Sequence, residues 1–320
     1  MKKFLTITFL LIGFFPINDF AQRQIHEYAD DKIKCSYETS QGRIDGAYVS
    51  FYLSGQKKAE GTFENNCRIS KWTVWDSTGR IRMQREYENP FVFKRIIPAA
   101  PNEKPIALLN VPRYTLEYNS DGYINDFNVT EGMIWWHKRI WRFLPITNNE
   151  LLFRNNLLFQ ILQKNILNGN VTAYGTEMFK KEFTPLIDTS DIQMIGYKIK
   201  EDRFFDTERF LDETRILGIC PVAFNKLSKD TIDLYWVYFP QIRKYLAQEK
   251  IENTGRASKI KTLDDIFFFR DFSGQIYKES NVFDRKISDY KTGNDVEKEV
   301  ESIEINIIET EHDNWIYFTK

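Results

Sequence analysis

The chain has 320 residues, of which 42% are hydrophobic and 15% aromatic. This composition supplies enough apolar side chain for packed cores and argues against a disordered protein. A formal net charge of -1 argues against nucleic-acid binding, because such proteins gather uncompensated Lys and Arg on one face. The length fits two domains, and we expect partners among proteins or the cell envelope.

Residues 1–21 have the order of a secretory signal peptide. Basic residues precede an apolar run from Phe4 to Phe15, and a small residue, Ala21, follows it. The run is too short to span a bilayer, and no cysteine for lipid attachment comes directly after it. We therefore expect cleavage near Ala21 and a periplasmic or extracellular protein without a transmembrane segment.

The three cysteines are Cys35, Cys67 and Cys220. In an oxidising compartment Cys35 and Cys67 have two interpretations, because the sequence gives no distance between them. The favoured one is two unpaired thiols, and the alternative is a disulfide across the N-terminal domain. Cys220 lies in an apolar run that we expect to be a buried strand.

Residues 30–95 contain an internal repeat. Tyr48, Phe51, Gly55 and Phe63 realign with Trp72, Trp75, Gly79 and Tyr87 at a constant offset of 24 residues. The two glycines suit the positive φ of tight turns, and the flanking residues alternate as in strands. The pattern resembles MORN-type repeats over about two units, which implies short stacked hairpins that form a binding or spacer surface. A plain β-meander is the alternative.

Residues 96–130 are expected to be a linker or an extra hairpin. Proline is frequent from Pro90 to Pro112, and proline fixes φ and removes a hydrogen-bond donor. The segment from Tyr114 to Val129 is centred on Asp121-Gly122 and predicts one more hairpin. With this boundary, deletion of residues 30–95 is expected to spare folding of the second domain.

Residues 131–320 mix helix and strand signals, so the fold class is α+β. A helix is predicted from Asn149 to Asn168, Pro240 opens a short helix, and Thr262 with Asp265 forms a capping box. Strands are predicted at residues 171–174, 192–199, 213–222 and 231–239.

The last helix is predicted over residues 294–311. Its apolar stripe is Val296, Val300, Ile303 and Ile307. Five glutamates accompany the stripe, namely Glu297, Glu299, Glu301, Glu304 and Glu309. They are either a solvated face or an acidic docking surface.

No catalytic or cofactor motif is recognisable. His26, His137 and His312 are isolated in sequence, without metal-ligand spacing, and no glycine-rich phosphate loop is present. We expect neither an enzyme nor a bound cofactor. The aromatic and basic run from Trp135 to Arg142 has Trp135 and Trp141 near one face at helical spacing, which favours packing or a protein contact over nucleic acid.

The C-terminal part is identified as resembling the GldN (PorN) family of gliding motility and type IX secretion proteins. The blocks that carry the resemblance are 136–142, 171–174, 204–209, 215–221, 235–240, 279–285 and 311–315. The resemblance implies a non-enzymatic periplasmic component that assembles with an outer-membrane lipoprotein of the GldK/PorK type into a ring. The repeat-like N-terminal region is atypical of the family, and Phe283 stands where the family has tyrosine. An accessory, immunity-like binding protein is therefore the alternative.

Aromatic and arginine side chains that exceed the needs of a core are candidates for a protein interface. They are Trp136, Arg139, Trp141, Trp236, Tyr238, Phe268, Phe269, Phe283 and Arg285. Phe268 and Phe269 are equally well explained as core residues. Arg285 has an intramolecular ion pair as its alternative role.

Overall fold

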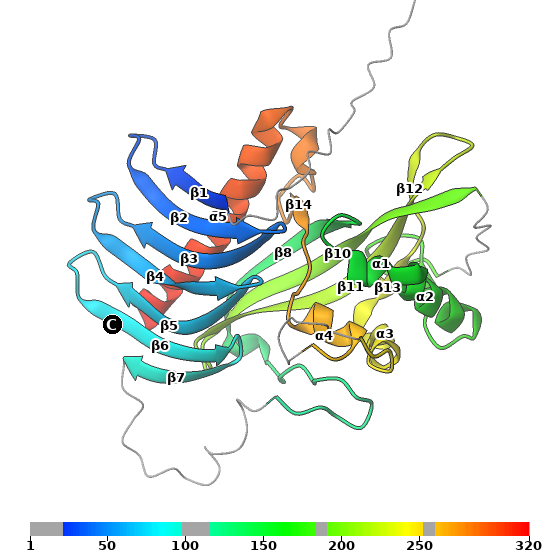
Figure 1. Ribbon diagram of the computed structural model, residues 1–320, viewed down its shortest axis with the longest axis horizontal. Helices are drawn as coiled ribbons and strands as arrows, with labels where there is room; N and C mark the ends of the chain where they lie inside the picture. The colour runs from blue at the N-terminus through cyan, green and yellow to red at the C-terminus, as the bar shows by residue number, and fades with distance from the viewer. Residues whose placement is uncertain (1–21, 98–115, 183–190, 252–259, 320) are drawn as a thin grey trace, which may run out of the picture.

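The computed structural model describes residues 22–97, 116–182, 191–251 and 260–319 (Figure 1). The predicted signal peptide and most of the proline-rich segment lie outside these residues. The described chain forms two antiparallel sheets, several short helices and one long helix, which is an α+β fold as expected.

The N-terminal sheet contains seven strands in sequence order, each hydrogen-bonded to the next. They are β1 (Gln22–Glu27), β2 (Ile33–Ser40), β3 (Arg43–Phe51), β4 (Lys57–Glu64), β5 (Cys67–Trp75), β6 (Ile81–Asn89) and β7 (Val92–Ile97). Strand β7 ends at Ile97, so the N-terminal sheet includes the first two residues of the segment expected to be a linker or hairpin. Asn89 accepts hydrogen bonds from the backbone N–H groups of Phe91 and Val92, which shapes a turn that brings the chain back to β6.

The repeated glycines occupy matching turns. Gly55 and Gly79 have φ values of 85° and 86°, and each donates its N–H to the carbonyl oxygen three residues earlier. A third turn of this form lies 24 residues before Gly55, where Asp31 takes a φ of 62° and donates to Tyr28. The repeat therefore has one more unit than the sequence indicates, because Asp replaces Gly at the left-handed position.

The C-terminal sheet has the order β14-β8-β10-β11-β13-β9, with β12 paired to β11. Its strands are β8 (Ile134–Pro145), β9 (Ala173–Tyr174), β10 (Ile192–Asp206), β11 (Leu211–Asn225), β12 (Thr231–Asp233), β13 (Trp236–Tyr238) and β14 (Gln275–Glu279). The helices are α1 (Glu150–Phe153), α2 (Leu157–Leu167), α3 (Phe239–Leu246), α4 (Leu263–Phe268) and α5 (Asn294–Phe318), with 3-10 turns η1 (Glu131–Met133), η2 (Arg154–Asn156) and η3 (Ile287–Asp289).

The capping box that opens α4 is confirmed. Thr262 accepts a hydrogen bond from the Asp265 N–H, and Asp265 accepts one from the Thr262 N–H. Pro240 lies in the first turn of α3, as predicted. A bridge between Tyr118 and Ile124 likewise confirms the extra hairpin around Gly122.

Three element predictions are wrong. The segment from Trp135 to Arg142 belongs to β8 and not to a helix, and the pairing of β8 with β10 shifts by one residue at Trp135. Trp135 stacks on Tyr317 of α5, whereas Trp141 packs with Cys220 and Trp236, so the two tryptophans do not share a face. The helix from Asn149 to Asn168 is broken into α1, η2 and α2, because Asn155 and Asn156 take positive φ values. The strand predicted over residues 231–239 is divided into β12 and β13.

Helix α5 lies between the two sheets and is longer than predicted, since it continues to Phe318 (Figure 1). The predicted stripe packs on the C-terminal sheet, where Ile303 and Ile307 are buried with Ile140 and Ile276. Another side of the helix packs on the N-terminal sheet. Buried residues of this second contact are Cys35, Tyr37, Tyr48, Ala59, Phe63, Trp72, Val74, Met83, Tyr87, Phe205, Ile305, Ile308 and Trp315.

This shared core argues against independent folding of the second domain. Ile305, Ile308 and Trp315 are buried by strands of the N-terminal sheet, and Phe205 of β10 belongs to the same cluster. Deletion of residues 30–95 exposes this side of α5 to water. The shared core therefore argues against the expectation that the deletion spares the second domain, which stays a prediction.

Cys35 and Cys67 are not joined by a disulfide. Cys35 lies on β2 and Cys67 on β5, so two strands separate them. Three inter-strand steps place the two strands roughly 14 Å apart, which is far beyond the reach of a disulfide. Cys35 and Cys220 are fully buried, and burial raises the pKa of the Cys35 thiol to about 12.

Candidate partner-binding surface

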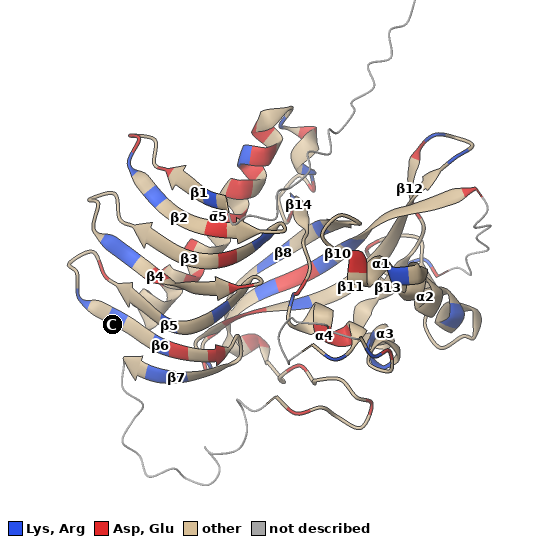
Figure 2. Cartoon of the chain, viewed as in Figure 1, with Lys and Arg blue, Asp and Glu red and all other residues tan. Residues whose placement is uncertain are grey.

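Buried ion pairs connect the C-terminal sheet with Arg270 and with α5, the helix that lies between the two sheets. Glu201 of β10 is fully buried and pairs with Arg142 of β8 at 2.9 Å and with Arg270 at 2.6 Å. Burial raises the pKa of Glu201, but the charges of Arg270 and Arg142 outweigh burial and hold the pKa below its usual value. Arg142 also pairs with Glu304 of α5. Figure 2 shows charges of both signs along the central strands and α5.

The glutamates of α5 divide between the two roles that the sequence left open. Glu304 pairs with Arg142 of the C-terminal sheet, and buried Glu309 pairs with Lys58 of β4 at 2.7 Å. Glu309 also accepts a hydrogen bond of 2.7 Å from the Tyr48 hydroxyl. Glu297 and Glu301 are exposed. Glu304 and Glu309 therefore bind cations of the same chain, and an acidic docking surface for another protein stays a prediction.

His312 is fully buried on α5, against the rings of Tyr48, Trp72 and Trp315. Its Nδ1 lies 3.4 Å from a carboxylate oxygen of Glu309. Burial lowers the pKa of His312. The imidazole is therefore a neutral core side chain, and the structure gives it no exposed edge for acid–base work.

This burial predicts acid sensitivity. The folded-state pKa lies below the ordinary value of 6.5, so stability from neutral His312 is present above that value and is lost as pH falls below it. The His312→Phe variant has no imidazole to protonate. Its free energy of unfolding should therefore fall less between pH 7.5 and pH 5.5 than that of the unchanged chain. Denaturant unfolding of both proteins at the two pH values measures it. Equal losses in both proteins would contradict the prediction.

The predicted interface residues differ in their exposure to solvent. Trp141, Trp236 and Phe269 are no more than 8% exposed and pack in the core, so these three are not carried into the proposal below. Trp136 and Phe268 are partly buried against core clusters. Arg139 makes a two-bond contact with Asp202 at 2.6 and 2.8 Å. Tyr238, Phe283 and Arg285 are exposed.

The loop of residues 281–285 presents two apolar side chains to solvent. Val282 is 97% exposed and Phe283 is 73% exposed. The Asn281 side chain holds the loop, because its Oδ1 accepts from the N–H groups of Phe283 and Arg285 and its Nδ2 donates to the Arg285 carbonyl oxygen. Asp284 adds an ion pair of 2.7 Å to Lys278 of β14. Polar contacts at the base of the loop therefore hold the apolar tip in one conformation before any partner binds.

Arg285 fixes the exposed ring. Its guanidinium lies 4.7 Å from the centre of the Phe283 ring and 5.2 Å from that of Tyr290. Cation–π contacts of this kind need no burial of the ring. The sequence predicted Arg285 as a contact residue, with an ion pair as the alternative. In the structure the guanidinium stacks on two aromatic rings.

A second exposed aromatic pair escaped the sequence analysis as a site. Trp135 at the start of β8 is 55% exposed and Tyr317 at the end of α5 is 52% exposed. Their rings stack with centres 5.4 Å apart and planes at 20°. The residues are far apart in sequence, so only the packing of α5 on β8 reveals the pair.

The described residues contain no group of three or more His, Cys, Asp or Glu side chains placed to hold a metal ion. Among the helices of the described ranges, none combines the length and apolar composition needed to cross a membrane. The loop of residues 281–285 carries two of the most exposed large apolar side chains of the described residues, Val282 and Phe283. Its chemistry suits binding.

A family model described as "Gliding motility associated protein GldN" matches residues 129–316, more than half of the chain. The match contains the whole C-terminal sheet, the loop of residues 281–285 and most of α5. No curated protein matches the chain. The matched range excludes strands β1 to β7, so the resemblance of that sheet to MORN-type repeats stays a prediction.

Proposed function

Because the chain belongs to the GldN family of gliding-motility-associated proteins, we propose that it is a non-enzymatic structural component of the type IX secretion and gliding machinery. In this proposal the signal peptide directs it to the periplasm. There it binds an outer-membrane lipoprotein of the GldK/PorK type and assembles into a ring. The lipoprotein supplies the membrane anchor.

The observation that carries the proposal is the apolar loop tip inside the family-matched range. Val282 and Phe283 are 97% and 73% exposed, although the loop around them is held by hydrogen bonds. Exposed apolar side chains on an ordered base lose little conformational freedom on binding. Aromatic and arginine side chains are also the usual hot spots of interfaces. The loop is therefore our candidate docking point for the lipoprotein.

The loop can be tested with Val282→Ser combined with Phe283→Ser. We expect binding to the purified lipoprotein to weaken by about tenfold or more, since two anchor side chains are lost. Thermal unfolding should be unchanged, because both side chains are exposed in the folded chain. Surface plasmon resonance with the immobilised lipoprotein measures the affinity.

Leu227→Ser is the matched control, since Leu227 is a 74% exposed apolar residue on the turn between β11 and β12. This variant should bind as the unchanged chain does. If the loop variant and the control bind equally well, the loop is not the docking point.

A second function is favoured by one observation. The seven-stranded sheet lies wholly outside the family-matched range, and the face turned away from α5 is open to solvent. Under this alternative the chain is an accessory binding protein, a paralogue whose distinctive activity belongs to the sheet. Recovery of a toxin-like partner in place of a secretion component would favour this alternative.

A further inference from the structure

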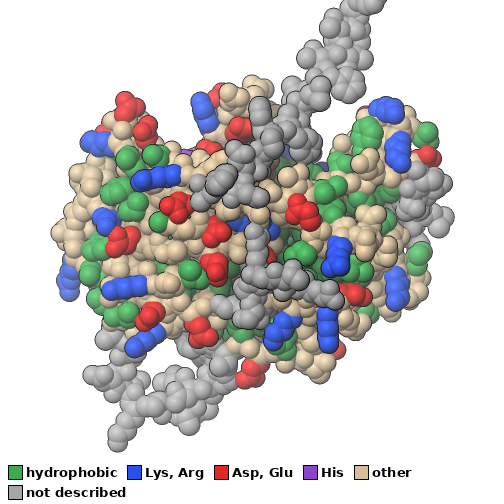
Figure 3. All heavy atoms as spheres, in the orientation of Figure 1, with side chains coloured by type: hydrophobic (Ala, Val, Ile, Leu, Met, Phe, Trp, Pro, Cys, Tyr) green, Lys and Arg blue, Asp and Glu red, His purple; other side chains and the backbone are tan. Residues whose placement is uncertain are grey.

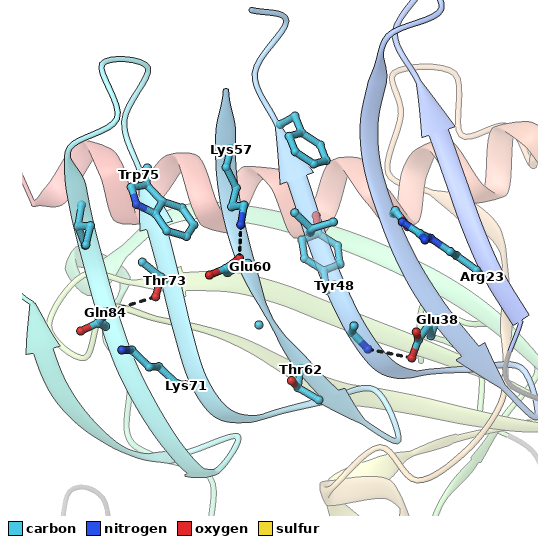
Figure 4. A pocket seen from close by; sticks show the side chains of 16 residues that line it. Arg23, Glu38, Tyr48, Lys57, Glu60, Thr62, Lys71, Thr73, Trp75 and Gln84 are labelled. Carbon is cyan, nitrogen blue, oxygen red and sulfur yellow. Dashed lines mark hydrogen bonds and ion pairs between the residues drawn. The ribbon is translucent and has the colours of Figure 1, made fainter. Parts of the chain in front are cut away.

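The face of the N-terminal sheet that is turned away from α5 carries a trough of about 840 Å³ (Figure 4). Its lining comes from six successive strands, from Arg23 on β1 to Gln84 on β6. Six strands span roughly 24 Å across a sheet. The trough is therefore long and open, unlike the enclosed apolar pockets that usually hold small molecules.

Small and large side chains give the trough its shape. Ala47, Thr62 and Thr73 contribute small side chains to the lining, whereas Lys57 and Trp75 are long or wide. In Figure 4 the labelled side chains of Lys57, Trp75 and Lys71 stand on the same side of the sheet, with α5 behind it. The trough follows from the pattern of side-chain sizes on the outer face of the strands.

The lining repeats with the 24-residue period of the sheet. Ser36, Glu60 and Gln84 occupy equivalent positions on β2, β4 and β6, and each brings a hydrogen-bonding group to the trough. Phe51 and Trp75 are equivalent on β3 and β5, and each brings an aromatic ring. Equivalent positions two strands apart lie roughly 10 Å from each other. A surface that repeats in this way suits a ligand that repeats.

Hydrogen-bonding capacity remains in the trough. Gln84 donates to Thr73 at 3.2 Å and Lys57 donates to one oxygen of Glu60 at 2.5 Å. The Gln84 carbonyl oxygen and the second Glu60 carboxylate oxygen are left as acceptors. Among the described residues, the Lys71 side chain has no hydrogen-bond or ion-pair partner. Donors and acceptors are thus both available, as a hydroxyl-rich ligand requires.

Charge and exposure argue against other ligand classes. The lining has three cations, Arg23, Lys57 and Lys71, against two anions, Glu38 and Glu60. The space-filling view also shows charges of both signs scattered over this part of the molecule (Figure 3). A polyanion needs a surface of one sign. The large apolar side chains of the trough, Val49, Phe51, Trp75 and Ile81, are only partly exposed, whereas a protein partner needs prominent apolar anchors.

We propose that this trough binds an uncharged glycan strand. The apolar faces of two sugar rings, separated by one further ring, lie on Phe51 and Trp75, and hydroxyl groups of the strand bond to side chains at the positions of Glu60, Lys71 and Gln84. This site lies outside the family-matched residues, so it is a function separate from lipoprotein docking. The glycan chain of the cell wall and a free polysaccharide share this chemistry.

The probe is a hexamer of N-acetylglucosamine, titrated into the purified chain by isothermal calorimetry and two-dimensional NMR. We expect saturable binding with shifts confined to β1–β6. Trp75→Ala should weaken binding by about tenfold or more, because aromatic stacking is lost. Trp135→Ala is the control, since it removes an exposed aromatic residue from the other sheet and should leave binding unchanged.

Two further variants separate loss of binding from loss of fold. Gln84→Ala and Lys71→Ala remove polar groups of the trough with little effect on the core, and each should weaken binding while circular dichroism stays unchanged. The variant that carries Val282→Ser and Phe283→Ser should keep full glycan affinity. Failure of lipoprotein docking and failure of glycan binding are therefore distinguishable.

Two polymer assays identify the source of the glycan. Co-sedimentation with purified peptidoglycan sacculi, prevented by Trp75→Ala, would assign the ligand to the cell wall. Retention by a soluble neutral polysaccharide alone would assign it to a free glycan. Absence of binding to the hexamer and to both polymers would overturn the proposal, as would binding that is unchanged in Trp75→Ala. Binding to anionic lipid vesicles alone would also overturn it.

Discussion

Replacing Trp315 with alanine is expected to lower the free energy of unfolding of the whole chain by about 3–5 kcal/mol, as for other large buried aromatic residues. Trp315 on α5 is fully buried. Its ring lies about 5 Å from the guanidinium groups of Arg68 and Arg85 on the N-terminal sheet. Its Nε1 donates a hydrogen bond of 3.1 Å to the carbonyl oxygen of Phe210.

Denaturant unfolding measures this effect, followed both by circular dichroism and by tryptophan fluorescence. The two signals should shift together, because Trp315 belongs to the core that the two sheets share. Tyr317→Ala is the control, since Tyr317 is 52% exposed on the same helix, and it should cost less than about 1 kcal/mol. A Trp315→Ala variant that loses no more stability than this control would show that α5 does not join the sheets.

Replacing Glu201 with glutamine is the second substitution with a large expected effect. Glu201 is fully buried between Arg142 and Arg270, and its loss leaves two guanidinium groups short of a counter-charge. Removing one partner of a buried ion pair costs about 3–5 kcal/mol. Denaturant unfolding at pH 7 measures the difference from the unchanged chain. A much smaller loss of unfolding free energy would mean that solvent reaches the ion pairs of Glu201.

The pH dependence gives the Glu201 prediction a second test. The pKa of Glu201 is held below its ordinary value of 4.5, so its stabilisation is present above that value and is lost as pH falls. The stability difference between the two proteins should therefore shrink in acid. Glu60→Gln is the control, because the pair of Glu60 with Lys57 is about 45% exposed and exposed pairs contribute little. A difference that persists unchanged at pH 3 would contradict the assigned role.

Local signals in the sequence predicted much of the fold. The offset of 24 residues located the turns at Gly55 and Gly79, because a tight turn needs a residue that accepts positive φ. The capping box of Thr262 and Asp265 located the start of α4. Such signals depend on neighbours in sequence, and they are readable without knowledge of the tertiary structure.

Long-range packing is the part that the sequence did not reveal. The stripe of α5 that contains Ile303 and Ile307 was recognised, but the second contact through Ile305 and Trp315 was not. A helix with two packed sides has no simple amphipathic pattern. The same limit explains why β8 was taken as helical, since alternation of Trp and basic residues fits both periods over a short run.

The sequence predicted the candidate interface only in part, because it does not reveal which side chains are buried by long-range packing. The excess of aromatic and arginine side chains singled out Phe283 and Arg285, and both are exposed. It also singled out Trp141 and Trp236, which are buried. Residue type alone does not separate an aromatic side chain of the core from one at an interface. The exposure of each side chain has to come from the structure.

The most direct test of the account is an affinity purification of the tagged chain from its own cell envelope, with bound proteins quantified by mass spectrometry. The account predicts recovery of an outer-membrane lipoprotein in a fixed ratio to the chain. It also predicts loss of that lipoprotein when Val282 and Phe283 are both replaced by serine. Recovery of no secretion component, or of a toxin-like partner alone, would contradict the proposed role in the secretion machinery.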